Sequence, residues 1–144
     1  MQTTTVVTAS PQRAHLQPER GNYAVILASG LEDGGKRATL ALAAACTAQA
    51  MDLNTIVFLI GDGAYWGYDG HAEGVHAPGF PALADLMESF FESGGQILLC
   101  SACDAVCSSP TNTDGISLKR RRGVRPQGLA SVLSHTVRGS SVTF

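Results

Sequence analysis

Three of the four cysteines lie within eight residues, directly after an apolar run. Cys100 ends the run Gln96–Cys100, Cys103 follows after two residues, and Cys107 after three more. A thiol between the end of a strand and the start of a helix meets free backbone N–H groups and the positive end of the helix dipole, and both favour the thiolate. We therefore predict that Cys100 and Cys103 are reactive, catalytic thiols. Cys107 and Cys46 fit buried small hydrophobes better, as free cysteines often do.

The same spacing leaves two other chemistries open. Two cysteines separated by two residues are also the pattern of a dithiol redox pair, and three are able to bind a metal ion. A structural zinc site usually has four ligands, often as two separated pairs, and this chain has one cluster without a second pair. His135 would have to be brought to the cluster by the fold, and the run differs from common iron–sulfur spacings. We expect no metal and no organic cofactor, and a redox or metal site is the alternative.

Positive charge is concentrated near the C-terminal end. Residues 1–114 contain all 12 acids and four of the ten bases, for a charge of −8, whereas residues 115–144 contain six bases and no acid. If the basic run folds toward the cysteines, Arg120, Arg121 and Arg122 are candidates to hold an anionic sulfur species. A solvated loop or a contact with an acidic partner is the alternative. The overall charge of −2 and the lack of interleaved aromatic residues make direct nucleic-acid binding unlikely.

Asp62 and Trp66 are the remaining candidates for contact with a substrate or anion. Asp62 lies in the turn Gly61-Asp62-Gly63, and Trp66 lies in an irregular segment, residues 64–79, which is rich in glycine, histidine and aromatic residues. Such a segment is able to line a pocket. The alternatives are ordinary turn chemistry for the glycines and an aromatic plug at the rim of a core. Neither glycine-rich phosphate-binding motif occurs, so nucleotide binding has no support.

Short apolar runs alternate with helical patterns along the chain. The runs at 23–28, 55–60 and 96–100 are typical of strands buried on both faces. Helical patterns cover 36–51 and a segment that opens at Phe80-Pro81 and is ended by Gly94-Gly95. The remaining expected elements are a short fourth strand at 123–125, a final helix whose first turn holds Pro126 and which Gly139 ends, and a fifth strand at 141–144.

This alternation predicts parallel βαβ units with right-handed crossovers. The fold class that we expect is α/β, a three-layer α/β/α sandwich with a five-stranded, mainly parallel sheet. In such sheets, chemistry gathers beyond the carboxyl ends of the strands, and the turns after Ala28, Ile60 and Cys100 all lie there.

Composition and length indicate one compact domain. The chain has 144 residues, of which 44% are hydrophobic and 15% charged, enough apolar material for a core. We expect a flexible N-terminal tail at residues 1–20 and a single domain at 21–144. The tail lacks the apolar stretch of a signal peptide, and no run is long enough to span a membrane. We therefore expect a cytoplasmic protein without a membrane partner, in a compartment that keeps its thiols reduced.

Residues 23–144 resemble the DsrE/DsrF-like sulfur-relay family, which includes YchN-like and TusBCD-type subunits. The resemblance rests on three segments in order. Ile56–Gly63 follows an Ala-rich helix, Gly94–Cys100 leads into a turn of small residues, and Gly123-Val124 leads through Leu129 to the ending Val142-Thr143-Phe144. The longer segment at 64–79, the extra thiols and the N-terminal tail depart from the family pattern.

The resemblance implies a sulfur carrier or sulfurtransferase without a cofactor. In this family, the cysteine after the third strand carries sulfur as a persulfide, which assigns that role to Cys100; Cys103 would be a second acceptor or a resolving thiol. The implied partners are sulfur donor and acceptor proteins of a sulfur-oxidation or tRNA-thiolation relay, and the implied assembly is a homo-oligomer, trimer or hexamer. Some members lack the cysteine, so a noncatalytic oligomeric subunit that binds a partner or an anion is the alternative.

Overall fold

A computed structural model describes residues 20–108 and 118–144. The expected tail therefore lies outside the described residues except for Arg20. The elements, in chain order, are β1 (Asn22–Leu27), the 3₁₀ turn η1 (Leu31–Asp33), α2 (Lys36–Ala50), β2 (Asn54–Leu59), η2 (Gly61–Gly67), α3 (Leu83–Glu92), β3 (Gln96–Cys100), α4 (Ser101–Cys107), β4 (Arg125–Gln127), α5 (Leu129–Thr136) and β5 (Gly139–Thr143).

The five strands form one sheet in the order β4-β3-β2-β1-β5. Every neighbouring pair is parallel, so the expected α/β fold with a five-stranded sheet is confirmed. The two central strands are almost continuously apolar because helices cover both faces of the sheet. Parallel pairing brings the carboxyl ends of β1, β2 and β3 to one edge, where η1, η2 and α4 begin.

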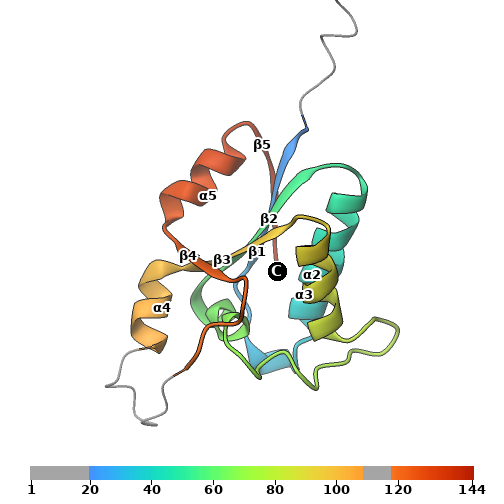
Figure 1. Ribbon diagram of the computed structural model, residues 1–144, viewed down its shortest axis with the longest axis vertical. Helices are drawn as coiled ribbons and strands as arrows, with labels where there is room; N and C mark the ends of the chain where they lie inside the picture. Colours follow the sequence, from blue (N-terminus) through green and yellow to red (C-terminus); the bar gives the residue numbers. More distant parts are fainter. Residues whose placement is uncertain (1–19, 109–117) are drawn as a thin grey trace, which may run out of the picture.

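Helices lie on both sides of the sheet, with α2 and α3 on one side and α4 and α5 on the other (Figure 1). The α2/α3 face holds the larger cluster of fully buried side chains, including Leu42, Phe90 and Leu99. The α4/α5 face holds a cluster of six buried residues: Ala24, Ile56, Phe58, Leu98, Cys100 and Val132. Alternation along β3 therefore directs Leu99 to the large cluster and Cys100 to the small one.

The C-terminal part differs from the sequence expectation. Pro126 does not open a helix: it lies inside β4 and pairs with Leu99, and α5 begins only after Gly128. Proline has no N–H to donate, and an edge strand of three residues tolerates that loss. Likewise Gly139 does not end the final helix but begins β5, where a Cβ atom would overlap the carbonyl oxygen of Asn22.

Two further element boundaries differ from those expected from the sequence. Residues 64–67, expected to be irregular, belong to η2, whose 3₁₀ turns place Trp66 and Tyr68 against the large cluster. The helix expected to open at Phe80-Pro81 begins at Leu83. The polar stretch between Ser108 and Arg122 lies partly outside the described residues.

Candidate functional site: a thiol pair at the carboxyl edge of the sheet

Cys100 is both the last residue of β3 and the residue that caps the N-terminus of α4. The apolar run before it forms a buried strand, and the small residues after it allow the chain to turn at once into a helix. The side chain belongs to the small cluster on the α4/α5 face, and only 6% of the residue is exposed. Cys100 therefore lies at the carboxyl edge of the sheet, as expected from the sequence.

The surroundings of Cys100 favour its thiolate. Burial alone opposes ionisation, but the backbone N–H groups of Cys103 and Ala102 and the thiol of Cys103 favour negative charge on the sulfur, and together they hold the pKa of Cys100 below its usual value. These amides belong to the first turn of a helix, where backbone N–H groups have no partner within the helix. The thiolate is the nucleophilic form of cysteine, so Cys100 is suited to attack an electrophilic sulfur.

Cys103 has the opposite character. Burial raises its pKa, and the neighbouring sulfur atoms of Cys100 and Cys107 raise it further, although the N–H of Gly61 donates a hydrogen bond to its Sγ at 3.3 Å. Cys103 therefore keeps its proton to a higher pH than Cys100 does. The two thiols form one site with an acidic and a less acidic member.

The turn Gly61-Asp62-Gly63 positions this site through its backbone. Gly61 adopts φ +59, a left-handed conformation that favours glycine, and directs its N–H at Cys103. A Cβ atom at Gly63 would overlap the carbonyl oxygen of Leu27, so glycine lets η2 approach the end of β1. Asp62 is exposed at this turn and lines a pocket of about 310 Å³ together with Tyr65 and other residues.

Tyr68 and Asp104 fasten α4 to η2. The buried Tyr68 hydroxyl donates a hydrogen bond to Oδ1 of Asp104 at 2.7 Å. Burial, this bond and the proximity of Cys107 together raise the pKa of Tyr68 far above its usual value, so the hydroxyl stays a donor. The sequence analysis did not select either residue as functional, because nothing in their spacing, 36 positions apart, shows that they meet.

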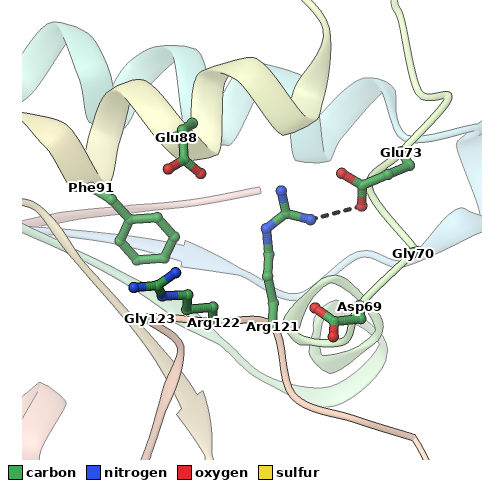
Figure 2. A pocket seen from close by; sticks show the side chains of 8 residues that line it. All are labelled: Asp69, Gly70, Glu73, Glu88, Phe91, Arg121, Arg122 and Gly123. Atoms are coloured by element: carbon green, nitrogen blue, oxygen red, sulfur yellow. Dashed lines mark hydrogen bonds and ion pairs between the residues drawn. The ribbon is translucent and has the colours of Figure 1, made fainter.

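The three arginines diverge instead of facing the thiols together. Arg120 lies on the α4 side, with Nε 3.9 Å from Oδ2 of Asp104. Arg121 turns away and forms an ion pair of 2.7 Å with Glu73. Arg121 and Arg122 both line a separate pocket of about 630 Å³, where Arg122 lies beside Phe91 (Figure 2). Only Arg120 of the three predicted anion-binding residues therefore lies near the cysteine helix.

A backbone pairing explains the divergence of the arginines. The N–H of Asp69 donates to the carbonyl of Lys119, the N–H of Arg121 donates to that of Gly67, and Tyr68 pairs with Arg120 in an antiparallel bridge. Successive side chains of an extended segment point to opposite sides, so Arg120 and Arg121 are separated. The chain turns at residues 122–123, and Arg122 therefore lines the same pocket as Arg121.

Trp66 does not lie in a binding surface. Its side chain is fully buried, and its indole N–H donates to the carbonyl oxygen of Ser29 at 2.9 Å. The prediction that it contacts a substrate or anion is corrected by this burial: Trp66 is the core plug that was the alternative reading. Within residues 64–79, Tyr65 and His71 are half-buried, and their rings stack with centroids 3.9 Å apart.

The cysteine chemistry is that of thiols. All four cysteines lie in the described part of the chain, and no disulfide joins them. Within residues 20–108 and 118–144, no group of three His, Cys, Asp or Glu side chains is arranged to hold a metal ion. His135 lies at the opposite end of the sheet, where its Nε2 is 3.1 Å from the carbonyl oxygen of Tyr23 and 2.8 Å from that of Asn54. In the same residues, no helix has the length and apolar character needed to cross a membrane.

Comparisons with known proteins agree with the fold. The crystal structure of the YchN protein from E. coli superposes with a TM-score of 0.62 over 85% of this chain and 99% of that one, at 20% sequence identity. No curated protein matches the chain by sequence. The profile of the DsrE/DsrF-like family matches residues 22–132. This range includes β2, β3 and α4, the elements that position Cys100 and Cys103. The chain therefore belongs to the DsrE/DsrF-like family.

Proposed function

We propose that this protein is a sulfur carrier that accepts persulfide sulfur on Cys100 and passes it on. The observation that carries the proposal is the placement of Cys100 at the junction of β3 and α4, beside the backbone N–H groups of the first helical turn and the second thiol of Cys103. Membership of a family of sulfur-relay proteins supports the choice of sulfur as cargo. The donor and acceptor are proteins or small molecules that carry persulfides and thiols.

The loading step needs only thiol chemistry. The Cys100 thiolate attacks the outer sulfur of a donor persulfide, a new S–S bond forms at Cys100 Sγ, and the donor leaves as a thiolate. The product is a persulfide anion, which requires stabilisation comparable to that of the thiolate. The amides of Ala102 and Cys103 supply it, and Arg120 adds positive charge at the same helix through its contact with Asp104.

We also propose that the chain assembles into a homo-oligomer through α5. Leu129, Leu133 and Val137 recur every four residues, so they form one stripe, and they are 56%, 66% and 76% exposed. Val132, which lies about 100° around the helix from Leu133, is buried against the sheet. An apolar stripe of this kind on a helix usually marks a surface that another protein covers. A trimer or hexamer is the assembly that we expect.

We place the protein in the cytoplasm, where a reducing environment keeps such thiols reactive. The absence of any disulfide among the four cysteines supports this placement.

Persulfide loading tests the function directly. The reduced full chain is incubated with glutathione persulfide, blocked with iodoacetamide and weighed by intact mass spectrometry. We expect wild type and the matched control Cys46→Ser to gain the mass of one sulfur atom, and Cys100→Ser to gain none. Wild-type protein that gains no sulfur would overturn the carrier function.

A dithiol–disulfide couple is a second candidate, because the Cys103 thiol contacts the Cys100 sulfur. It predicts that mild oxidation by glutathione disulfide removes two hydrogen atoms from wild type but not from Cys103→Ser. A chain that stays reduced under these conditions and still loads sulfur favours the carrier.

A further inference from the structure

Cys100 and Cys103 differ in how an acceptor reaches them. Cys100 is 6% exposed and belongs to the buried cluster, whereas Cys103 is half-buried and packs against both clusters. The surface above α4 has a depression of about 370 Å³ lined by Gly61, Ala102, Cys103, Val106 and Cys107. Cys103 lines this depression and Cys100 does not, so a protein thiol that docks there meets Cys103 first.

Cys103 lies between the buried Cys100 and the surface depression. On one side its thiol lies close enough to the sulfur of Cys100 to shift the pKa of that thiol, and on the other its Sγ accepts the N–H of Gly61 at 3.3 Å. The Gly61 amide donates to sulfur and therefore supports negative charge on it. Both cysteines thus have a backbone donor of their own, as an anion that moves from one to the other requires.

We propose that Cys103 is the exit thiol, which takes the outer sulfur from Cys100 and presents it in the depression above α4 to the thiol of an acceptor protein. This inference rests on the proposed loading of Cys100. It assigns the depression as the acceptor site, and the exposed apolar side chain of Val106, 72% exposed, favours an acceptor segment with an apolar surface around its cysteine.

The transfer balances without an oxidant or reductant. The Cys103 sulfur, after loss of its proton, attacks the outer sulfur of the Cys100 persulfide; the bond from Cys103 Sγ to that sulfur forms while its bond to Cys100 Sγ breaks. The electron pair remains on Cys100, which takes up one proton, so a persulfide and a thiol yield a thiol and a persulfide. The acceptor thiol then repeats the exchange at Cys103.

The acid strengths of the two thiols favour this direction. A thiol of higher pKa is the stronger nucleophile once ionised, and a thiol of lower pKa is the better leaving group. The pKa of Cys103 is raised and that of Cys100 is lowered. Cys103 is therefore the better attacking group and Cys100 the better leaving group, and protonation of Cys103 holds the sulfur on Cys100 until a base removes the proton.

Site-resolved mass spectrometry follows the sulfur. Trypsin is unsuitable because no Lys or Arg lies between Arg37 and Lys119, so all four cysteines remain in one peptide. Cleavage before aspartate separates Cys107 from a peptide, 85–103, that holds Cys100 and Cys103, and fragmentation then distinguishes these two. The chain is loaded with glutathione persulfide, sampled over time and blocked with iodoacetamide.

We expect sulfur on Cys100 first and on Cys103 later in wild type. Discharge to a short synthetic peptide with one cysteine should slow at least about tenfold in Cys103→Ser, with sulfur retained on Cys100. Cys103→Ala should behave as Cys103→Ser does, which separates the loss of the thiol from an effect of the hydroxyl. Cys46→Ser, which changes a thiol that packs against the large cluster and lies outside the depression, should discharge like wild type.

The outcomes separate this inference from the proposed function. Wild type that loads Cys100 but discharges no faster than Cys103→Ser would overturn the exit role and leave the carrier intact. Release of hydrogen sulfide with a Cys100–Cys103 disulfide would also overturn it, because Cys103 would then attack the inner sulfur. Wild type that never loads Cys100, or Cys100→Ser that loads Cys103, would defeat the proposed function itself.

Discussion

The two faces of the sheet differ in how completely their apolar side chains are buried. On the α2/α3 face, Leu42, Phe90, Trp66 and their neighbours are fully buried within the described chain. On the α4/α5 face, six residues form the buried cluster, and α5 turns a stripe with Leu133 at its centre to the outside. The proposed thiol pair lies beside the second face. Most of the buried apolar side chains lie on the first face, and the second leaves more apolar surface exposed beside the thiols.

The difference also explains how a buried thiol stays usable. Cys46 packs against the large cluster, and burial there raises its pKa. Cys100 is also buried, but it lies where a strand becomes a helix, so unpaired amides compensate the loss of water. On this less completely covered face, the next thiol along α4, Cys103, lines a surface depression.

The largest effect is expected from a cavity in the complete face. Phe90→Ala removes a fully buried ring from the large cluster and should lower the free energy of unfolding by about 3–5 kcal/mol, measured by urea denaturation. Ala substitution of Leu129 in the exposed stripe is the comparison, and a monomer should lose about 0.5 kcal/mol or less. Equal losses at both sites would show that the α4/α5 face is covered as fully as the other.

Self-association is the next test of the comparison. Leu133→Glu places a charge in the centre of the stripe and should convert the oligomer into a monomer in sedimentation velocity, since burying an unpaired carboxylate is costly. Leu40→Glu is the matched control, because Leu40 is exposed on α2, outside the stripe. Dissociation of Leu40→Glu with an intact Leu133→Glu oligomer would move the interface to the α2/α3 face.

A smaller effect is expected where α4 is fastened to η2. Tyr68→Phe removes the hydroxyl that donates to Asp104 and should cost about 1–3 kcal/mol of stability in urea denaturation, because Asp104 loses its closest donor. Tyr65→Phe is the control, a neighbouring tyrosine whose hydroxyl has no bonded partner among the described residues. A cost equal to that of the control would mean that α4 is held by packing alone.

The finest test compares the pH profiles of the thiols. Alkylation by iodoacetamide follows the thiolate, so its rate rises as the pH passes through each pKa. The midpoint of the profile should lie below the ordinary thiol pKa for Cys100, and above it for Cys46 and Cys103. Site-resolved mass spectrometry reads each cysteine separately. A Cys100 midpoint above that of Cys46 would contradict the role of the amides.

Much of the fold was predictable because each central element has a local signal. The runs that form β1, β2 and β3 are short, apolar and bounded by glycines or small residues, and they form strands close to the expected limits. The position of Cys100 at the end of β3 followed from the same run. Residues three apart at the start of a helix are neighbours, which is why Cys103 lies beside Cys100.

Contacts between distant segments were not predictable in this way. Pro126 suits the first turn of a helix by its own chemistry, yet it lies in β4 because β3 offers an open edge for pairing. Trp66 suits a pocket rim, yet the carbonyl of Ser29 and the large cluster take it into the core. In each case, the partner lies far away in the sequence, and its geometry decides.

By itself, the sequence determined that a cysteine ends a buried parallel strand and that a second thiol follows one helical turn later, because strand and helix periodicity are local properties. Only the tertiary structure decided which groups tune that pair. The Gly61 amide reaches Cys103 from the end of β2, and the basic segment pairs with residues 67–69 so that Arg120 alone turns toward α4. These choices depend on where distant backbone groups find hydrogen-bond partners, which residue types and spacing do not specify.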